Sequence, residues 1–109
     1  MDSTGPGLSF DVRRVSGDTA IVMGPDLKSV AYLVSSTRRD PIALSLPAAA
    51  TATSRFITVT NIGSARRITL VTQAGETIDR DTAPFAIEGQ IKSVTLATDG
   101  VEWIVVSVR

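Results

Sequence analysis

Short runs of β-branched and other apolar residues, interrupted by turn residues, are the feature that most constrains the fold of this chain. Valine, isoleucine and threonine fill 34 of the 109 positions, whereas leucine fills seven. Such a composition fits the pleated, half-buried surface of β-strands. No segment shows a sustained helical periodicity of apolar residues. The runs are TAIVM, SVAYLVSS, IALSL, RFITVTN, RRITLVT, KSVTLAT and VEWIVVSV, and a short alternating piece precedes them. We therefore predict an all-β fold, a small antiparallel β-sandwich or barrel-like domain.

The strongest local signal is a β-hairpin close to the last residue. The runs KSVTLAT and VEWIVVSV flank Asp99-Gly100, a dipeptide favoured in a two-residue type I′ turn because both central positions need a positive φ. Such a turn places Leu96 opposite Trp103 and Val94 opposite Val105. We assign this side of the hairpin to the domain interior.

The last run is apolar on its other side as well, where Ile104, Val106 and Val108 occupy alternate positions. Two explanations remain open. Either a second sheet of the same chain covers this side, or a neighbouring copy packs against it. Each such side chain contributes about 1.5–3 kcal/mol when fully buried, and association is a useful source of stability for a small domain. Ile104, Val106 and Val108 are accordingly our candidates for a subunit interface.

The first part of the chain has a different character. Residues 1–17 carry Gly5-Pro6-Gly7 and a broken apolar pattern, so we interpret them as an N-terminal arm and residues 18–109 as a single β domain. Leu8, Phe10 and Val12 alternate as in a strand. This strand either adds to the exposed edge of a neighbour or closes its own sheet.

Composition argues against several classes of function. The chain has neither cysteine nor histidine, which excludes disulfides, thiolate or imidazole zinc sites, and Ser-His or Cys-His triads within it. Eleven basic residues balance eleven acidic ones, whereas phosphate-backbone recognition usually needs excess positive charge. No secretory signal or membrane-spanning run is evident. We expect a protein that is made in the bacterial cytoplasm and needs no cofactor, with neither nucleic acid nor membrane as a partner.

A cluster of carboxylates and one tryptophan are candidates for ligand binding, but a structural role is the simpler interpretation of each. Glu76, Asp79 and Asp81 suit a hard cation such as calcium, but we favour turn residues that cap backbone amides or pair with Arg80. Trp103 could stack on a sugar, but its predicted pairing favours burial. We therefore assign no catalytic, cofactor-binding or metal-binding residue.

Three arginine pairs stand out in the sequence, Arg13-Arg14, Arg38-Arg39 and Arg66-Arg67. Arginine suits bidentate contacts with carboxylates at subunit boundaries. Adjacent strand residues point to opposite faces, however, so no pair forms a patch by itself. Solvated surface charge is the favoured interpretation of any single pair.

The order of several phrases in residues 42–107 is distinctive. They contain IALSLPAA, a small-residue loop, RFITVTNIGSARRITLVTQAGETID and IKSVTLATDGVEWIVVS. This order resembles a β-rich module in virion proteins of tailed bacteriophages, in which Leu-Pro-Ala-Ala, Ile-Thr-Val-x-Asn-x-Gly, Ile-Thr-Leu, Gly-Glu-Thr-Ile-Asp and an Asp-Gly-x-x-Trp hairpin follow one another. The chain departs from this pattern at Arg80, where relatives often have glycine.

The resemblance implies a non-enzymatic structural module of the kind found in tail fibres, tail spikes, head fibres and capsid decoration proteins, commonly assembled as homotrimers. The sequence lacks a long glycine-rich shaft, which favours a compact capsid decoration (cement) protein on the virion surface. Such a protein binds the major capsid protein and stabilises the head. Its arm would dock on the shell, and the candidate docking residues are Leu8, Phe10, Val12, Arg13 and Arg14.

Two other functions remain as alternatives. One is a tail-fibre or receptor-binding module that recognises a host surface glycan. The other, which we disfavour, is a small carbohydrate-active enzyme that uses Glu76 or Asp79, because such an enzyme needs two carboxylates at a fixed separation in a cleft.

Overall fold

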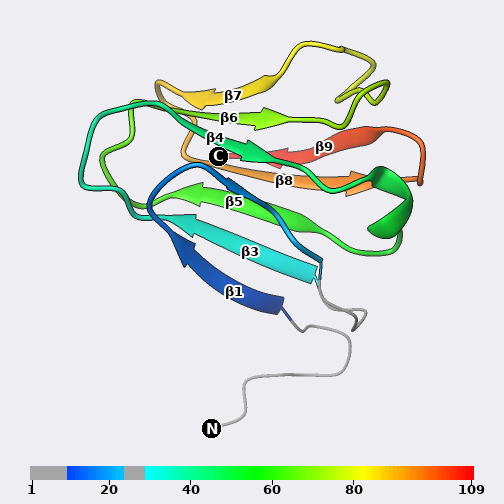
Figure 1. The fold of residues 1–109 in the computed structure, drawn as a ribbon, viewed down its shortest axis with the longest axis horizontal. Helices are drawn as coiled ribbons and strands as arrows, with labels where there is room; N and C mark the ends of the chain where they lie inside the picture. Colours follow the sequence, from blue (N-terminus) through cyan, green and yellow to red (C-terminus); the bar gives the residue numbers. More distant parts are fainter. Residues whose placement is uncertain (1–9, 24–28) are drawn as a thin grey trace, which may run out of the picture.

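The computed structural model describes residues 10–23 and 29–109, which form two facing β-sheets around one hydrophobic core (Figure 1). The elements are β1 (Phe10–Val15), β2 (Thr19–Ala20), β3 (Ser29–Val34), β4 (Ile42–Ser45), a 3₁₀ turn η1 (Ala49–Thr51), β5 (Ile57–Asn61), β6 (Arg67–Val71), β7 (Phe85–Glu88), β8 (Ser93–Thr98) and β9 (Trp103–Val108). The five-stranded sheet has the order β1-β3-β5-β8-β9, and the four-stranded sheet has the order β2-β4-β6-β7. The predicted all-β domain is confirmed, as an open sandwich rather than a closed barrel.

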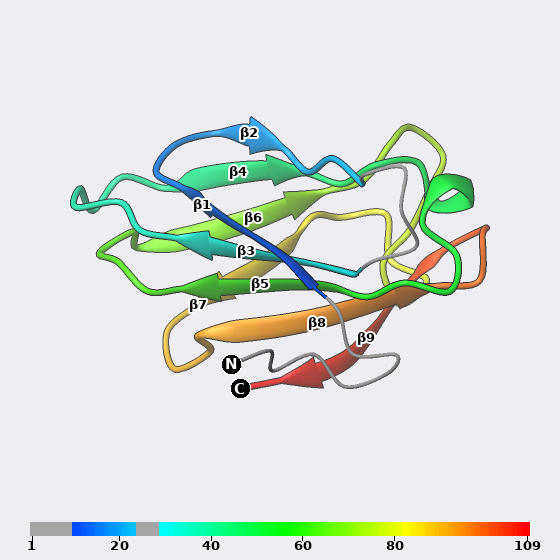
Figure 2. The same cartoon turned by 90° about the horizontal axis from the view of Figure 1, so that it is seen from below.

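The first six strands alternate between the two sheets (Figure 2). As a result β1, β3 and β5 run parallel, and so do β2, β4 and β6. Parallel neighbours need a crossover connection, and here each crossover runs through a strand of the opposite sheet. The sheets are therefore mixed. Among the described strands, the antiparallel pairing that we predicted holds for β5–β8, β6–β7 and β8–β9.

The core lies between the sheets and consists of alternate residues of the strands. In β3, Val30, Tyr32 and Val34 are buried and the residues between them are half-buried. The backbone N–H of Val22 donates to the Tyr32 hydroxyl oxygen at 3.0 Å, which pairs the polar end of this buried ring. The largest fully buried side chains are Trp103, Leu44, Leu46, Ile57, Ile68, Leu70, Ile87 and Leu96.

Part of the predicted arm belongs to the sandwich. Residues Phe10–Val15 form β1, which pairs in parallel with β3 at the edge of the five-stranded sheet. Of the two alternatives for this strand, closing its own sheet is the one observed. Val12 is 63% exposed, and Arg13 and Arg14 are exposed as well. The candidate docking residue Leu8 lies outside the described residues.

Strand β7 belongs to none of the apolar runs from which we predicted strands. It has four residues and pairs antiparallel with β6, where Ile87 lies opposite Ile68 in the core. A run this short, directly after Pro84, carries too little alternation to be recognised alone. The described residues include no helix that is long and apolar enough to cross a membrane.

Candidate functional site

The hairpin of β8 and β9 differs in register from the prediction. Thr98 lies opposite Trp103 and Leu96 opposite Val105, so the connection comprises residues 99–102 and the predicted two-residue turn is wrong. The predicted pairs of Leu96 with Trp103 and of Val94 with Val105 are wrong for the same reason. Leu96, Trp103 and Val94 are nevertheless buried.

The longer turn is stabilised by its own side chains. Asp99 Oδ1 accepts hydrogen bonds from the backbone N–H groups of Val101 at 2.9 Å and Glu102 at 3.1 Å. The Thr98 hydroxyl oxygen accepts from the Gly100 N–H at 3.0 Å. The amides of Glu102 and Val101 hold the pKa of the Asp99 carboxyl below its ordinary value. Asp99 therefore promotes this turn through side-chain capping, which the Asp-Gly signal alone does not reveal.

A β-bulge changes the direction of the side chains along β9. Leu96 lies opposite Val105, but the next pair is Thr95 with Ser107. Val106 is thus the extra residue of the bulge. The alternation on which we based the interface candidates is interrupted at this residue.

The three candidate interface residues consequently do not form one row. Ile104 lies opposite Ala97, whereas Val108 lies opposite Val94, which is buried. Because residues opposite one another share a face, Ile104 and Val108 belong to different faces of the sheet, and their predicted common side is wrong. Ile104, Val106 and Val108 are 42%, 55% and 47% exposed, so the fold of one copy does not bury them.

One face of the five-stranded sheet points away from the core. On β3, β5 and β8, whose residues the structure describes throughout, this face carries no charged side chain. Two cross-strand hydroxyl pairs occupy its middle, Thr58 with Thr95 at 3.0 Å and Thr60 with Ser93 at 2.9 Å. Ile104 extends this surface onto β9 beside Ala97. We name it the outward face, and it comprises Ser29, Ala31, Leu33, Thr58, Thr60, Ser93, Thr95, Ala97 and Ile104.

The clustered carboxylates serve as backbone caps. Both carboxylate oxygens of Glu76 accept from the Ala49 N–H, at 3.2 and 3.1 Å. Asp79 Oδ1 accepts from the Val105 N–H at 3.1 Å. Asp81 Oδ1 accepts from the Ala83 N–H at 2.9 Å. This is the simpler of the two interpretations, and the described residues contain no group of acidic side chains placed to hold a metal ion.

Trp103 is completely buried, as we predicted when we favoured packing over sugar contact. Its backbone N–H donates to the Thr77 carbonyl and its carbonyl accepts from the Asp79 N–H, both at 2.8 Å. The Gly-Glu-Thr-Ile-Asp segment therefore lies against the start of β9, and Glu76 of the same segment reaches Ala49. Three of the five phrases on which the resemblance rests, Leu-Pro-Ala-Ala, Gly-Glu-Thr-Ile-Asp and Asp-Gly-x-x-Trp, thus contact one another at one end of the sandwich.

The β3–β4, β5–β6 and β7–β8 loops lie together at the opposite end of the sandwich (Figure 1). Residues of these loops line a cleft. It has a volume of about 530 Å³. Three cationic residues and three polar residues form much of its lining, namely Arg39, Arg66, Lys92, Thr37, Asn61 and Ser64. We name this the basic cleft.

Backbone hydrogen bonds connect the loops around the basic cleft. The Ser64 N–H donates to the Ser36 carbonyl at 2.7 Å, and the Arg66 N–H donates to the Arg39 carbonyl at 3.2 Å. The Asn61 N–H donates to the Lys92 carbonyl at 2.8 Å. Residues that are far apart in the sequence are thereby held next to one another.

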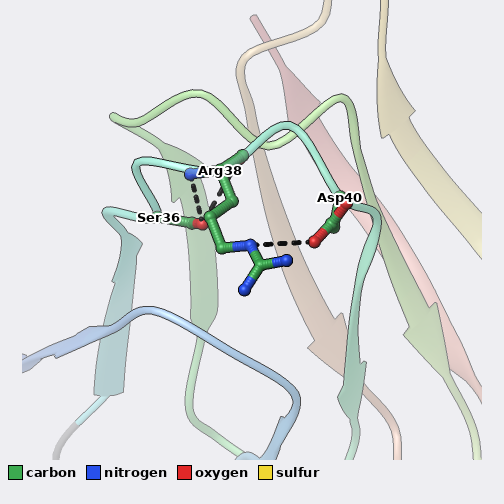
Figure 3. A network of polar contacts seen from close by, with 3 residues as sticks. All are labelled: Ser36, Arg38 and Asp40. Atoms are coloured by element: carbon green, nitrogen blue, oxygen red, sulfur yellow. Dashed lines mark hydrogen bonds and ion pairs between the residues drawn. The ribbon is translucent and has the colours of Figure 1, made fainter.

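In two of the three arginine pairs, one arginine lines this cleft and the other binds a nearby acidic residue. Figure 3 shows that Arg38 reaches Asp40, with Nε 3.0 Å from Oδ2. Arg67 pairs in the same way with Glu88 at 2.9 Å. The other members of the two pairs, Arg39 and Arg66, line the cleft.

The cleft is the part of the molecule that the sequence analysis did not find. Arg38, Arg39 and Arg66 lie in loops rather than in strands, and one member of each of two pairs joins Lys92 across three loops. The doubled arginines were a visible signal. The arrangement of the loops decides which arginine of each pair lines the cleft. It also decides that Lys92 lies beside them.

Charge is distributed unevenly between the two ends of the sandwich. The turns at the end opposite the basic cleft carry five acidic residues, Glu76, Asp79, Asp81, Asp99 and Glu102. The formal net charge of zero for the whole chain therefore conceals a basic end and an acidic end.

Comparison with known proteins adds no relative. No protein-family model matches the chain, and neither a curated protein nor a solved structure does.

Proposed function

We propose that this chain is a non-enzymatic structural protein of a phage virion, a homotrimeric decoration protein that binds the major capsid protein and stabilises the head. The proposal combines the family resemblance of residues 42–107 with one structural observation. That observation is the absence of charged side chains from the outward face on β3, β5 and β8.

The outward face supports contact between copies because the centres of protein interfaces are depleted of charge. Ordinary solvent-facing strands carry polar and charged residues, whereas β3, β5 and β8 present only small, hydroxyl-bearing or apolar side chains outward. Ile104 is 42% exposed at the margin of this surface. Covering it in an oligomer removes apolar area from water, and most soluble oligomers are symmetric assemblies of identical copies.

The edge strands support attachment to a second protein. β1 is a six-residue edge strand whose outer side has no partner strand among the described residues. Such an edge can accept an added strand from another chain. β1 also presents Val12, Arg13 and Arg14, which are exposed candidates for the shell contact.

Sedimentation equilibrium tests the homotrimer. We expect the wild-type chain to have three times its monomer mass of 11.5 kDa, and Ile104→Asp to shift the population to monomers because a carboxylate would be desolvated in the interface. Val101→Asp is the matched control, since Val101 is 74% exposed in the turn of the same hairpin and should leave the trimer intact. A wild-type chain that remains monomeric at high concentration would refute the homotrimer.

Quantitative mass spectrometry of purified virions tests the location. A decoration protein should occur in numbers comparable with the major capsid protein, and an image reconstruction should place its density on the head. A few copies per particle, located on the tail, would instead support the tail-fibre or receptor-binding alternative. Absence of the chain from virions would contradict both.

A further inference from the structure

We propose that the basic cleft binds a saccharide that carries a phosphate or carboxylate group. This inference does not rest on the virion proposal, because it follows from the charge, rigidity and lining of the cleft alone.

The charges around the cleft leave three cations available to a ligand. The acidic neighbours in these loops are Asp40 and Glu88, and they are paired with Arg38 and Arg67. Within residues 10–23 and 29–109, Arg39, Arg66 and Lys92 have no ion pair. Their three positive charges line one cleft, and an anionic group bound there is attracted to all of them.

The cleft is formed before any ligand arrives. The backbone bond from Arg66 to Arg39 and the bond from Asn61 to Lys92 fix the bases of all three cationic side chains. The Asn61 side chain stabilises the β5–β6 loop, because its Oδ1 accepts from the Gly63 N–H at 3.1 Å and its Nδ2 donates to the Ala65 carbonyl at 2.8 Å. A site whose frame is already ordered loses less conformational entropy on binding.

The lining indicates the chemical class of the ligand. Thr37 and Ser64 add hydroxyl groups to the cations, and these can hydrogen-bond to a polyhydroxylated molecule. Of the described residues that line the cleft, none is aromatic and none has an apolar side chain larger than alanine. This lining disfavours a nucleobase, because nucleobases stack on aromatic rings. It also disfavours a peptide or lipid that binds through an apolar group. A volume of about 530 Å³ lies in the range of small-molecule sites.

Titration of the ¹⁵N-labelled protein, followed by amide NMR, tests the proposal with four small probes and one peptide. Glucose 6-phosphate and glucuronate carry the two anionic groups on a sugar. Glucose lacks the charge, inorganic phosphate lacks the sugar, and a glutamate-rich peptide offers carboxylates on a polypeptide. We expect one or both anionic sugars to shift the amide signals of Gly63, Ser64 and Gly89 with a millimolar dissociation constant that rises with salt.

Matched variants locate the site. Arg39→Gln and Arg66→Gln should each weaken binding of the anionic sugar by about tenfold, the loss expected for one charge-assisted hydrogen bond. Arg80→Gln makes the same change of charge in an exposed turn at the opposite end of the sandwich, and should weaken binding less than about twofold because distant exposed charges are screened. Thermal unfolding of each variant checks that the fold is intact.

Several results would overturn the inference. Equal losses in Arg80→Gln and Arg39→Gln would mean general electrostatic attraction without a site. If inorganic phosphate bound as tightly as glucose 6-phosphate, the sugar would make no contribution and the ligand would not be a saccharide. If glucose bound as tightly as glucose 6-phosphate, the anionic group would make no contribution. Tighter binding of the glutamate-rich peptide would identify an acidic polypeptide as the ligand instead, and absence of any shift would exclude the site.

Discussion

Gly63 is the position at which the smallest addition to this protein should cause the largest local disturbance. A β-carbon built at Gly63 would lie 2.7 Å from the Ser35 carbonyl carbon and 2.8 Å from the Ser36 nitrogen, and would also overlap the Ser36 carbonyl oxygen. All three atoms belong to the backbone, so no side-chain rotation relieves the overlap. Gly63→Ala must therefore separate the β5–β6 loop from the β3–β4 loop.

The cost has two contributions. Forcing an extra methyl group into a packed site costs about 1–3 kcal/mol. The separation also stretches the 2.7 Å hydrogen bond from Ser64 to Ser36, and a bond of this kind contributes about 0.5–1.5 kcal/mol. We expect a combined loss of about 2–4 kcal/mol, which for a domain of this size lowers Tm by roughly 10–20 °C.

Urea and thermal unfolding of three glycine-to-alanine variants measure this effect. A β-carbon at Gly17 meets nothing within 4 Å, so Gly17→Ala should be neutral or stabilise by up to about 1 kcal/mol through the unfolded chain. Gly89 also has open space but a φ of +63°, so Gly89→Ala should cost about 1–2 kcal/mol from backbone strain. If Gly63→Ala were as stable as Gly17→Ala, the close approach of the two loops would be refuted.

Three further predictions concern the polar contacts of the fold. Glu76→Ala should lower the free energy of unfolding by about 1–3 kcal/mol, because the buried Ala49 N–H loses its acceptor. Glu76→Gln keeps an acceptor and should lower this free energy less. Equal urea midpoints for wild type and Glu76→Ala would contradict this role of Glu76. Because the pKa of Asp99 is lowered in the folded state, its contribution is present above the unfolded-chain pKa and is lost as pH falls through the folded pKa. The stability advantage of wild type over Asp99→Asn should therefore shrink on acidification, and an advantage that grows would reverse the assigned sign. Thr58→Val and Thr95→Val should each cost about 0.5–1.5 kcal/mol, and the double variant should cost less than their sum because no hydroxyl is left unpaired; strictly additive losses would count against the pair.

The strands that bury every second residue were predictable from local sequence. Alternation in β3 and β8 places Val30, Tyr32, Val94 and Leu96 in the core, because side chains of a strand point to opposite faces in turn. The burial of Trp103 was also predicted, but from a pairing with Leu96 that the structure does not have. Strand direction was not accessible in this way, since a parallel and an antiparallel neighbour bury the same alternate residues.

The β8–β9 hairpin is a case in which local sequence signals did not predict the turn length or the strand register. Asp-Gly predicts a tight turn by its backbone preference, but the side chain of Asp99 caps two amides and supports a longer connection. The bulge at Val106 then changes the face on which later residues lie. One extra residue is enough to separate Ile104 from Val108, because the side-chain period of a strand is two.

Alternation and turn residues in the sequence determined that this chain forms short strands with one apolar side, since those preferences act between residues close along the chain. Only the tertiary structure decided that successive strands cross between two sheets, and hence that three loops distant in sequence meet at one end. Arg39, Arg66 and Lys92 line one cleft for that reason, while five acidic side chains lie in the turns at the other end. Net charge is a sum over the chain, whereas a binding surface depends on where the topology places each charge.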